Sequence, residues 1–217
     1  YTKFIVTDQD LGTDNGGVHV RKWNIKSDGY LQSEGVTLDG SKTRAWQALK
    51  DAVRTASDGD VIAINGTIRA TNAGSGEYVD NGEIVIDKNL TIKKADTAAT
   101  AVLDANKDTG SKPKHRIFAV RVGNTLTLDN ITLQGGMAEG SEQNKHGGGV
   151  YVDGTLIMKG SSKITDCSAA GEGGGLFLYG TCTLQDSSSI THCEARDYGG
   201  GVFVDYSGRS ILNINGG

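Results

Sequence analysis

The chain has 217 residues, of which 36% are hydrophobic, 22% are charged and 32 are glycine. A net charge of −4 excludes the basic surface typical of nucleic-acid-binding domains, and no apolar run is long enough for a transmembrane helix, so no membrane insertion by this segment is expected. The glycines follow no three-residue period, which excludes collagen.

The first 40 residues predict short strands separated by turn-rich stretches. Residues 4–6, 18–25 and 30–31 carry the apolar runs, and DLGTDNGG and SDG lie between them. We expect this segment, 1–40, to lie along the amino-terminal end of the fold that follows.

Residues 41–57 predict the one clear helix. Ser41 or Thr43 can cap its amino terminus, and the helix leads directly into a turn and a buried strand, SDGDVIAINGTI. Its apolar residues recur at three- and four-residue spacing: Ala45, Trp46, Leu49, Ala52, Val53 and Ala56. We expect this helix to cap the following domain, covering both its apolar interior and its unpaired strand edge.

Residues 58–217 contain an internal repeat. The phrases GGGVYVDGTLIMKGSSKITDCSAAGE and GGGLFLYGTCTLQDSSSITHCEARDY begin at Gly147 and Gly173, and a third copy begins at Gly199, a constant period of 26 residues. A fixed period of this size is typical of a solenoid. Within each copy the apolar residues alternate, which indicates short β-strands rather than helices.

Strands at the same place in successive copies must pair in parallel, with one coil about 4.8 Å above the last. Connections between parallel strands are right-handed in nearly all proteins. The sequence therefore predicts an all-β fold, a right-handed parallel β-helix with an N-terminal capping α-helix. The third copy stops partway round a coil, so we expect the β-helix to continue beyond Gly217.

The triple glycines predict corners that need positive φ or close backbone approach. Upstream, IVIDKNLTI and VRVGNTLTL match VYVDGTLIM, and the coils shorten along the chain from 36 to 30 to 26 residues. The extra residues all precede the first strand of a coil. Such insertions form loops on one face of a solenoid, often the binding face.

Two stretches resemble known β-helical proteins. AWQALKDAVRTASDGDVIAINGTI, within residues 41–68, resembles the amino-terminal cap of pectate-lyase-like β-helices. GGGVYV, GGGLFL and GGGVFV, within residues 117–217, resemble repeats of polymorphic outer membrane proteins and related autotransporter adhesins, although ITDC and ITHC replace the aromatic–Asn companion motif. The resemblance implies a secreted passenger, or one displayed at a bacterial cell surface or outer membrane, that binds host or matrix glycan or protein.

Alignment of the first strands predicts a column of side chains on the outer face of the coils. The column contains Val85, Arg121, Tyr151, Phe177 and Phe203. Stacked rings edged by an Arg form a platform for sugar rings or for a partner's apolar side chains. The alternative is a structural ladder covered by the inserted loops or by residues 1–40.

A second candidate binding element is a basic patch in the loop before Arg121. It contains Lys107, Lys112, Lys114, His115 and Arg116. Such a patch can recognise an acidic glycan or an acidic partner. The alternative is a solvated loop without a ligand.

The cysteines predict one stacked pair and one core residue. Cys167 and Cys193 are one period apart, so they should lie on neighbouring coils within reach of a disulfide, as either a buried thiol ladder or a bridge. Cys182 aligns with Leu156 and is expected in the core. An odd count without a CxxC motif argues against a zinc site.

The residues define no catalytic, metal or cofactor site. A polysaccharide lyase needs carboxylates for Ca²⁺ and a nearby base. Asp87, Asp153 and Asp205 share a turn column, but the intervening coils are expected to carry Gly123 and Tyr179 there, and turn formation explains the acids. We therefore expect a non-catalytic adhesin segment; the alternatives are a lyase or hydrolase of acidic polysaccharide and a structural spacer.

Overall fold

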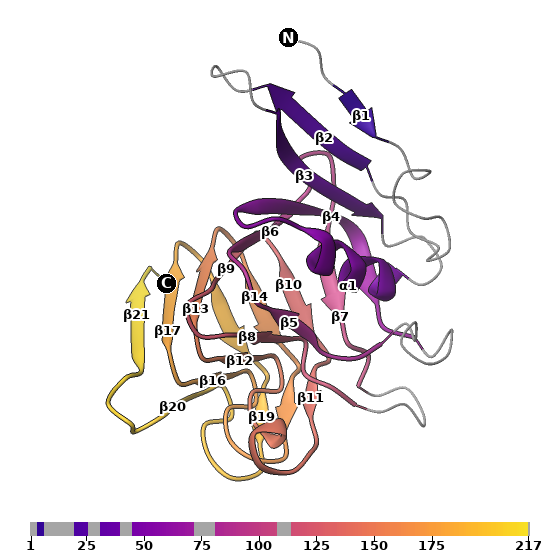
Figure 1. Ribbon diagram of the computed structural model, residues 1–217. Coiled ribbons are helices and arrows are strands. Elements are labelled where there is room, and N and C mark those ends of the chain that lie inside the picture. The colour runs from indigo at the N-terminus through magenta and orange to yellow at the C-terminus, as the bar shows by residue number, and fades with distance from the viewer. Residues whose placement is uncertain are drawn as a thin grey trace.

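The computed structural model describes residues 4–6, 20–25, 31–39, 45–71, 81–107 and 114–216, the first three ranges by their backbone alone. Its strands stack as a parallel β-solenoid, which confirms the predicted β-helix (Figure 1). One sheet, here the five-stranded sheet, takes one strand from each of five coils and is parallel throughout. Its strands are β5 (Ile84–Ile86), β8 (Phe118–Val120), β12 (Val150–Val152), β16 (Leu176–Leu178) and β20 (Val202–Val204).

A larger sheet forms two further walls of the coils, joined by one long strand. β4 (Asp60–Arg69) pairs through its first half with β6 (Leu90–Lys94) and through its second half with β7 (Ala101–Asp104). Gly66, the first residue of the second half, has φ +80°, which lets the strand bend there.

Each wall then grows by one strand per coil. The first wall continues from β6 through β9 (Thr125–Asp129), β13 (Thr155–Lys159), β17 (Thr181–Gln185) and β21 (Ile211–Asn215). The second continues from β7 through β10 (Thr132–Gln134), β14 (Lys163–Thr165) and β18 (Ser189–Thr191). A small third sheet contains β11 (Met137–Ala138), β15 (Ser168–Ala169) and β19 (Glu194–Ala195).

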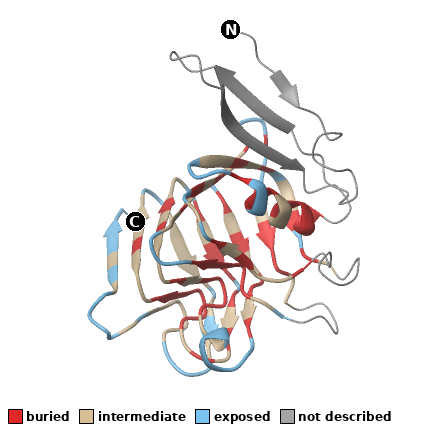
Figure 2. Cartoon of the chain, in the orientation of Figure 1, coloured by how far each residue is buried: buried red, intermediate tan, exposed pale blue. Residues whose placement is uncertain are grey.

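Alternation along the strands builds the core. In β12, Val150 and Val152 are buried and Tyr151 between them is half-buried, and β9 and β13 alternate in the same way. The buried apolar residues form one continuous cluster inside the coils, from the helix to the fourth coil (Figure 2). This is the interior that a solenoid accumulates by stacking repeats.

The triple glycines form a corner in each of the last three coils, as predicted. Gly147, Gly173 and Gly199 have φ of +66°, +66° and +65°. A Cβ on Gly149, the third glycine of its triple, would lie 2.5 Å from the carbonyl oxygen of Gly175 in the next coil. Both predicted reasons for glycine, positive φ and close backbone approach, are therefore present.

The predicted helix is α1 (Ala45–Thr55), which packs against β3 (Leu31–Asp39), β4 and β5. Trp46 is fully buried, and its Nε1 donates a hydrogen bond of 2.9 Å to the Gly82 carbonyl. At the other end of the helix, Lys88 Nζ donates to the Val53 and Arg54 carbonyls at 3.2 Å, where a cation is favoured. The helix therefore covers the apolar interior of the first coil, as expected.

The expectation that the helix also covers the unpaired strand edge was wrong for the first half of β4. There β3 pairs in parallel with residues 62–65 of β4. β2 (Val20–Ile25) pairs antiparallel with both β3 and β1 (Phe4–Val6). The first two predicted strands are therefore confirmed, and the third, expected at residues 30–31, is a nine-residue strand that joins this segment to the solenoid.

Candidate binding face

Three aromatic side chains, Tyr151, Phe177 and Phe203, form a stacked ring column on the five-stranded sheet. Tyr151 pairs in register with Phe177, and Phe177 with Phe203. Their ring centroids are 5.1 and 5.3 Å apart, with interplanar angles of 5° and 17°. These distances follow the spacing of stacked strands, about 4.8 Å. The ring stack predicted from the 26-residue repeat is confirmed.

Arg121 lies outside the ring column, so its predicted position was wrong. The register places Ala119 beside Tyr151, and Val85 beside Ala119. FAVRV contains the pattern apolar, x, apolar at residues 118–120 and again at residues 120–122. The strand of the structure is the first of these, residues 118–120. Arg121 then falls in the exposed turn after β8. A shift of two residues preserves the alternation of a strand, so the pattern alone did not separate the two registers.

Arg116 provides the Arg at the edge of the ring column. Its Cζ lies 5.2 Å from the centroid of the Tyr151 ring, within the range of a cation–π contact. Its Nε forms an ion pair of 2.7 Å with Glu83 Oε2, and its guanidinium donates to the Gln143 carbonyl at 2.9 Å. Burial lowers the pKa of Arg116, and Glu83 opposes that shift. Arg116 therefore ties together three coils beside the first ring.

The inserted loop before β12 covers the middle of the ring column. This loop, residues 135–146, contains the 3₁₀ helix η4 (Glu142–Lys145) and ends at His146, whose ring lies 4.8 Å from Phe177. Phe177 is only 6% exposed, whereas Tyr151 and Phe203 are half-buried. The other two predicted insertions include residues outside the described ranges. Phe177 therefore fits the alternative of a covered structural ladder, whereas Tyr151 and Phe203 remain partly accessible.

His146 makes the cover of Phe177 sensitive to pH. Its Nδ1 accepts a 3.0 Å hydrogen bond from the Glu172 N–H, which requires a neutral ring. Burial lowers the pKa of His146, and the Glu172 carboxylate, 3.1 Å away, opposes the shift. The other charges acting on the ring come from Lys145, Arg116 and Asp197. The folded state therefore favours the neutral imidazole.

We expect the wild-type chain to lose stability, relative to His146→Asn, as the pH falls below the ordinary His value of 6.5. The unfolded chain binds the proton at a higher pH than the folded chain does, so stability is full above 6.5 and declines on acidification. Thermal unfolding between pH 7.5 and 5 measures the effect. The exposed His192, changed to Asn, is the control; equal pH profiles for wild type and His146→Asn would contradict the prediction.

Two members of the predicted basic patch, Lys114 and Arg116, are paired with carboxylates. Lys114 Nζ lies 3.5 Å from Glu139 Oε1, and Arg116 is bound to Glu83. His115 turns towards the helix, with its ring 5.4 Å from the Trp46 ring. Lys112 lies outside the described residues. Lys114 and Arg116 therefore both bind the inserted loop of residues 135–146, Lys114 through Glu139 and Arg116 through the Gln143 carbonyl.

A second column, here the turn column, lies beside the ring column, where the strands of the five-stranded sheet end. Its members are the residues that follow the five strands of the five-stranded sheet: Asp87, Arg121, Asp153, Tyr179 and Asp205. Backbone hydrogen bonds link successive members to the strand below, such as Arg121 N–H to the Ile86 carbonyl at 2.9 Å. The expected Gly123 is absent from this column, and Arg121 stands between Asp87 and Asp153. The turn column also acts on the ring column, because burial raises the pKa of Tyr151 and Asp153 adds to that rise.

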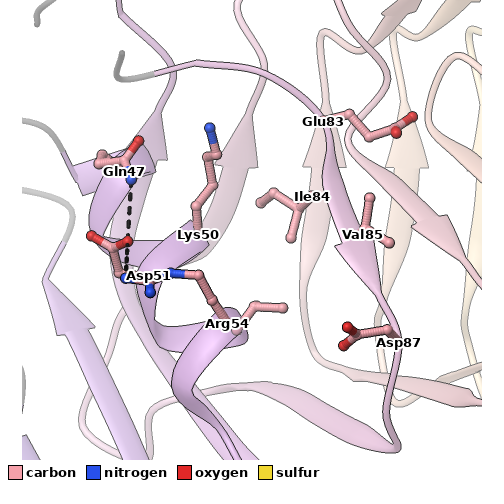
Figure 3. Close-up of a pocket in the computed structure, with 9 residues that line it drawn as sticks. Gln47, Lys50, Asp51, Arg54, Glu83, Ile84, Val85 and Asp87 are labelled. Carbon is pink, nitrogen blue, oxygen red and sulfur yellow. Dashed lines mark hydrogen bonds and ion pairs between the residues drawn. The ribbon is translucent and has the colours of Figure 1, made fainter. Parts of the chain in front are cut away.

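A groove of about 410 Å³ extends this face beyond the ring column, between α1 and β5 (Figure 3). Its apolar floor includes Val85, the residue in line with the rings. Lys50 on the helix donates to the Asn81 carbonyl at 3.0 Å, and Arg54 pairs with Asp51 at 3.1 Å. The sequence carried no signal for this groove, because its two walls lie 29 or more residues apart in the chain and its charges are mixed.

The cysteines lie where the repeat predicts, and all three are free thiols. Cys182 pairs with Leu156 and Leu212, and burial raises its pKa to about 12, as suits a core residue. Cys167 and Cys193 occupy neighbouring coils, with the Glu194 N–H donating to the Cys167 carbonyl at 2.9 Å. Of the two alternatives for this pair, the structure shows the thiol ladder.

Comparison of the chain with family models, with curated proteins and with solved structures finds no match. Among the described residues, no group of three or more His, Cys, Asp or Glu side chains is placed to hold a metal ion. In the same part of the chain, no helix combines the length and apolarity needed to cross a bilayer. The β-solenoid is thus shown by the structure, and membership of an adhesin family is a proposal.

Proposed function

We propose that this chain is a non-catalytic binding segment of a secreted or surface-displayed adhesin, with a host or matrix glycan or protein as its partner. The observation that carries the proposal is the ring column, whose rings repeat every 5.1–5.3 Å along a stiff solenoid. Tyr151 and Phe203 keep part of their surface open, which suits stacking on sugar rings or apolar side chains. The location at a cell surface rests on the resemblance of the glycine repeats alone.

A glycan fits this face better than a flat apolar partner does. The turn column beside the rings offers carboxylates, the Arg121 guanidinium and the Tyr179 hydroxyl as hydrogen-bonding groups. Arg209 Cζ lies 5.2 Å from the Tyr179 ring and adds a second cation to this edge. Ring faces next to polar groups match the apolar and hydroxyl faces of a sugar.

The position of Arg121 favours one alternative, a lyase or hydrolase of acidic polysaccharide. Arg121 stands between Asp87 and Asp153 in the turn column, so a basic and two acidic side chains occur on successive coils. Acid–base chemistry on an acidic polymer needs such neighbours. The experiment below distinguishes this activity from binding.

The test incubates the chain with a panel of acidic polysaccharides, with and without Ca²⁺, and follows both retention on the polymer and shortening of the polymer. We expect retention without cleavage, weakened about fivefold by Phe203→Ala, since an aromatic contact contributes about 1 kcal/mol. Tyr206, 92% exposed and in the same coil but outside the ring column, is the matched control as Tyr206→Ala.

Each other outcome has a definite reading. Cleavage that Arg121→Ala abolishes would replace the binding proposal with the enzyme. Equal retention for the Phe203 and Tyr206 variants would show that the ring column is not the binding face. Neither retention nor cleavage would overturn the glycan proposal, in favour of a protein partner or a structural spacer.

A further inference from the structure

Cys167 and Cys193 stand one above the other at the end of the solenoid described here. Their neighbours are paired in exact register, Ser168 with Glu194 and Ala169 with Ala195. Parallel strands bring such positions to about 4.8 Å, inside the Cα–Cα range of disulfides. Two cysteines on successive coils are thus held at bridging distance by the backbone rather than by a flexible loop.

Both side chains adopt the same orientation, and their thiols meet. Cys167 Sγ donates to the Thr165 carbonyl at 3.3 Å, and Cys193 Sγ to the Thr191 carbonyl at 3.2 Å, in each case two residues back. Each sulfur lies over the third glycine of a triple: Cys167 Sγ is 3.4 Å from a Cβ built on Gly149, and Cys193 Sγ is 3.1 Å from one on Gly175. A Cβ at Gly175 would crowd Cys193 Sγ, whereas one at Gly149 would make only an ordinary contact with Cys167 Sγ.

The two thiols of the 217-residue chain differ in burial and in pKa. Cys167 is fully buried, and Cys193 is half-buried. The Cys167 side chain lowers the pKa of Cys193 to about 7 by hydrogen bonding to the Cys193 thiolate when that forms, while the same contact and burial raise the pKa of Cys167. A thiol with a pKa near the ambient pH is the best attacking group in thiol–disulfide exchange.

We propose that Cys193 and Cys167 form a thiol–disulfide exchange site, which reacts with a small disulfide of the glutathione class and closes into a bridge between consecutive coils. In the first step the Cys193 thiolate attacks one sulfur of the disulfide. A Cys193–S bond forms, the small disulfide breaks and one thiolate leaves. In the second step Cys167 gives its proton to solvent and attacks Cys193 Sγ, which expels the second thiolate. Two electrons pass from the protein to the small disulfide.

The experiment treats the folded 217-residue chain with oxidised glutathione near pH 7 and analyses it by intact mass and peptide mapping. We expect the wild type to lose two hydrogen atoms and to yield one peptide pair joined through Cys167 and Cys193. Cys167→Ser should stop at a mixed disulfide on Cys193, because the second thiol is missing. Cys193→Ser should form no adduct in the same time.

Cys182 serves as the internal reference, because it has the same chemistry in a closed core. In Cys167→Ser, adduct formation at the half-buried Cys193 should be faster than at the buried Cys182, because burial raises the pKa of Cys182 to about 12. Oxidation of the wild type should also raise the midpoint of thermal unfolding, and reduction should reverse the rise.

The proposal fails if the folded wild type keeps three free thiols at high oxidant, or if the bridge involves Cys182. It also fails if the Cys167→Ser adduct maps to Cys182. Circular dichroism checks that each variant is folded. If a serine variant does not fold, the wild-type peptide map still decides, because a Cys167–Cys193 pair supports the site and three unmodified cysteines overturn it.

Discussion

Gly149→Ala is expected to destabilise the fold by about 3 kcal/mol or more, the upper range for overpacking a closed site. A Cβ at this position would lie 2.5 Å from the Gly175 carbonyl oxygen and 2.7 Å from Ile164 Cγ2. The carbonyl belongs to the next coil and accepts the Val150 N–H hydrogen bond at 2.9 Å, so it cannot move without loosening the parallel pairing. Urea unfolding followed by circular dichroism measures the loss.

Gly201→Ala is the matched control, since Gly201 is the same third glycine in the last coil. The nearest atom to its Cβ would be Ile190 Cγ2 at 4.0 Å, and neither Gly149 nor Gly201 has positive φ. This variant should differ from the wild type by less than about 0.5 kcal/mol. Similar losses for both variants would mean that the approach of the coils is not what requires glycine at Gly149.

The exact repeat is what allowed the fold to be predicted from sequence. From Gly147 onwards, each coil has the same length up to its first strand, so aligned residues are also stacked residues. That is why the stacking of Tyr151, Phe177 and Phe203, and of Cys167 with Cys193, followed from spacing alone. The alternation of apolar residues then settled which side of each strand faces the core.

The same reasoning failed where coil lengths differ. Before Gly147, loops of unequal length separate the strands, and alternation fits two registers equally well, so Arg121 was placed where Ala119 stands. The contacts that shape the candidate site are also long-range. Arg116 forms an ion pair with Glu83, which is 33 residues earlier in a coil of different length. The edge of β4 pairs with β3, and β3 belongs to a segment without the repeat.

Phe177→Ala is the second large effect we expect, a loss of about 3 kcal/mol, as for other large-to-small changes of buried aromatic residues. Phe177 has a ring on each side in the column and the His146 ring over it, and it is 6% exposed. Removal of its ring leaves a gap that the neighbouring coils cannot close, because their backbone spacing is fixed by hydrogen bonds. Thermal or urea unfolding measures the loss.

Phe203→Ala gives the comparison within the same column. Among the described rings, Phe203 stacks on Phe177 alone, and it is half-buried, so its removal should cost about 1 kcal/mol and leave the chain folded. Glycan retention then separates the two roles of the column. If Phe177→Ala were as stable as the wild type yet lost retention, the middle ring would be a ligand contact. If it lost stability while Phe203→Ala lost retention, the middle ring would hold the column together and the outer rings would meet the ligand.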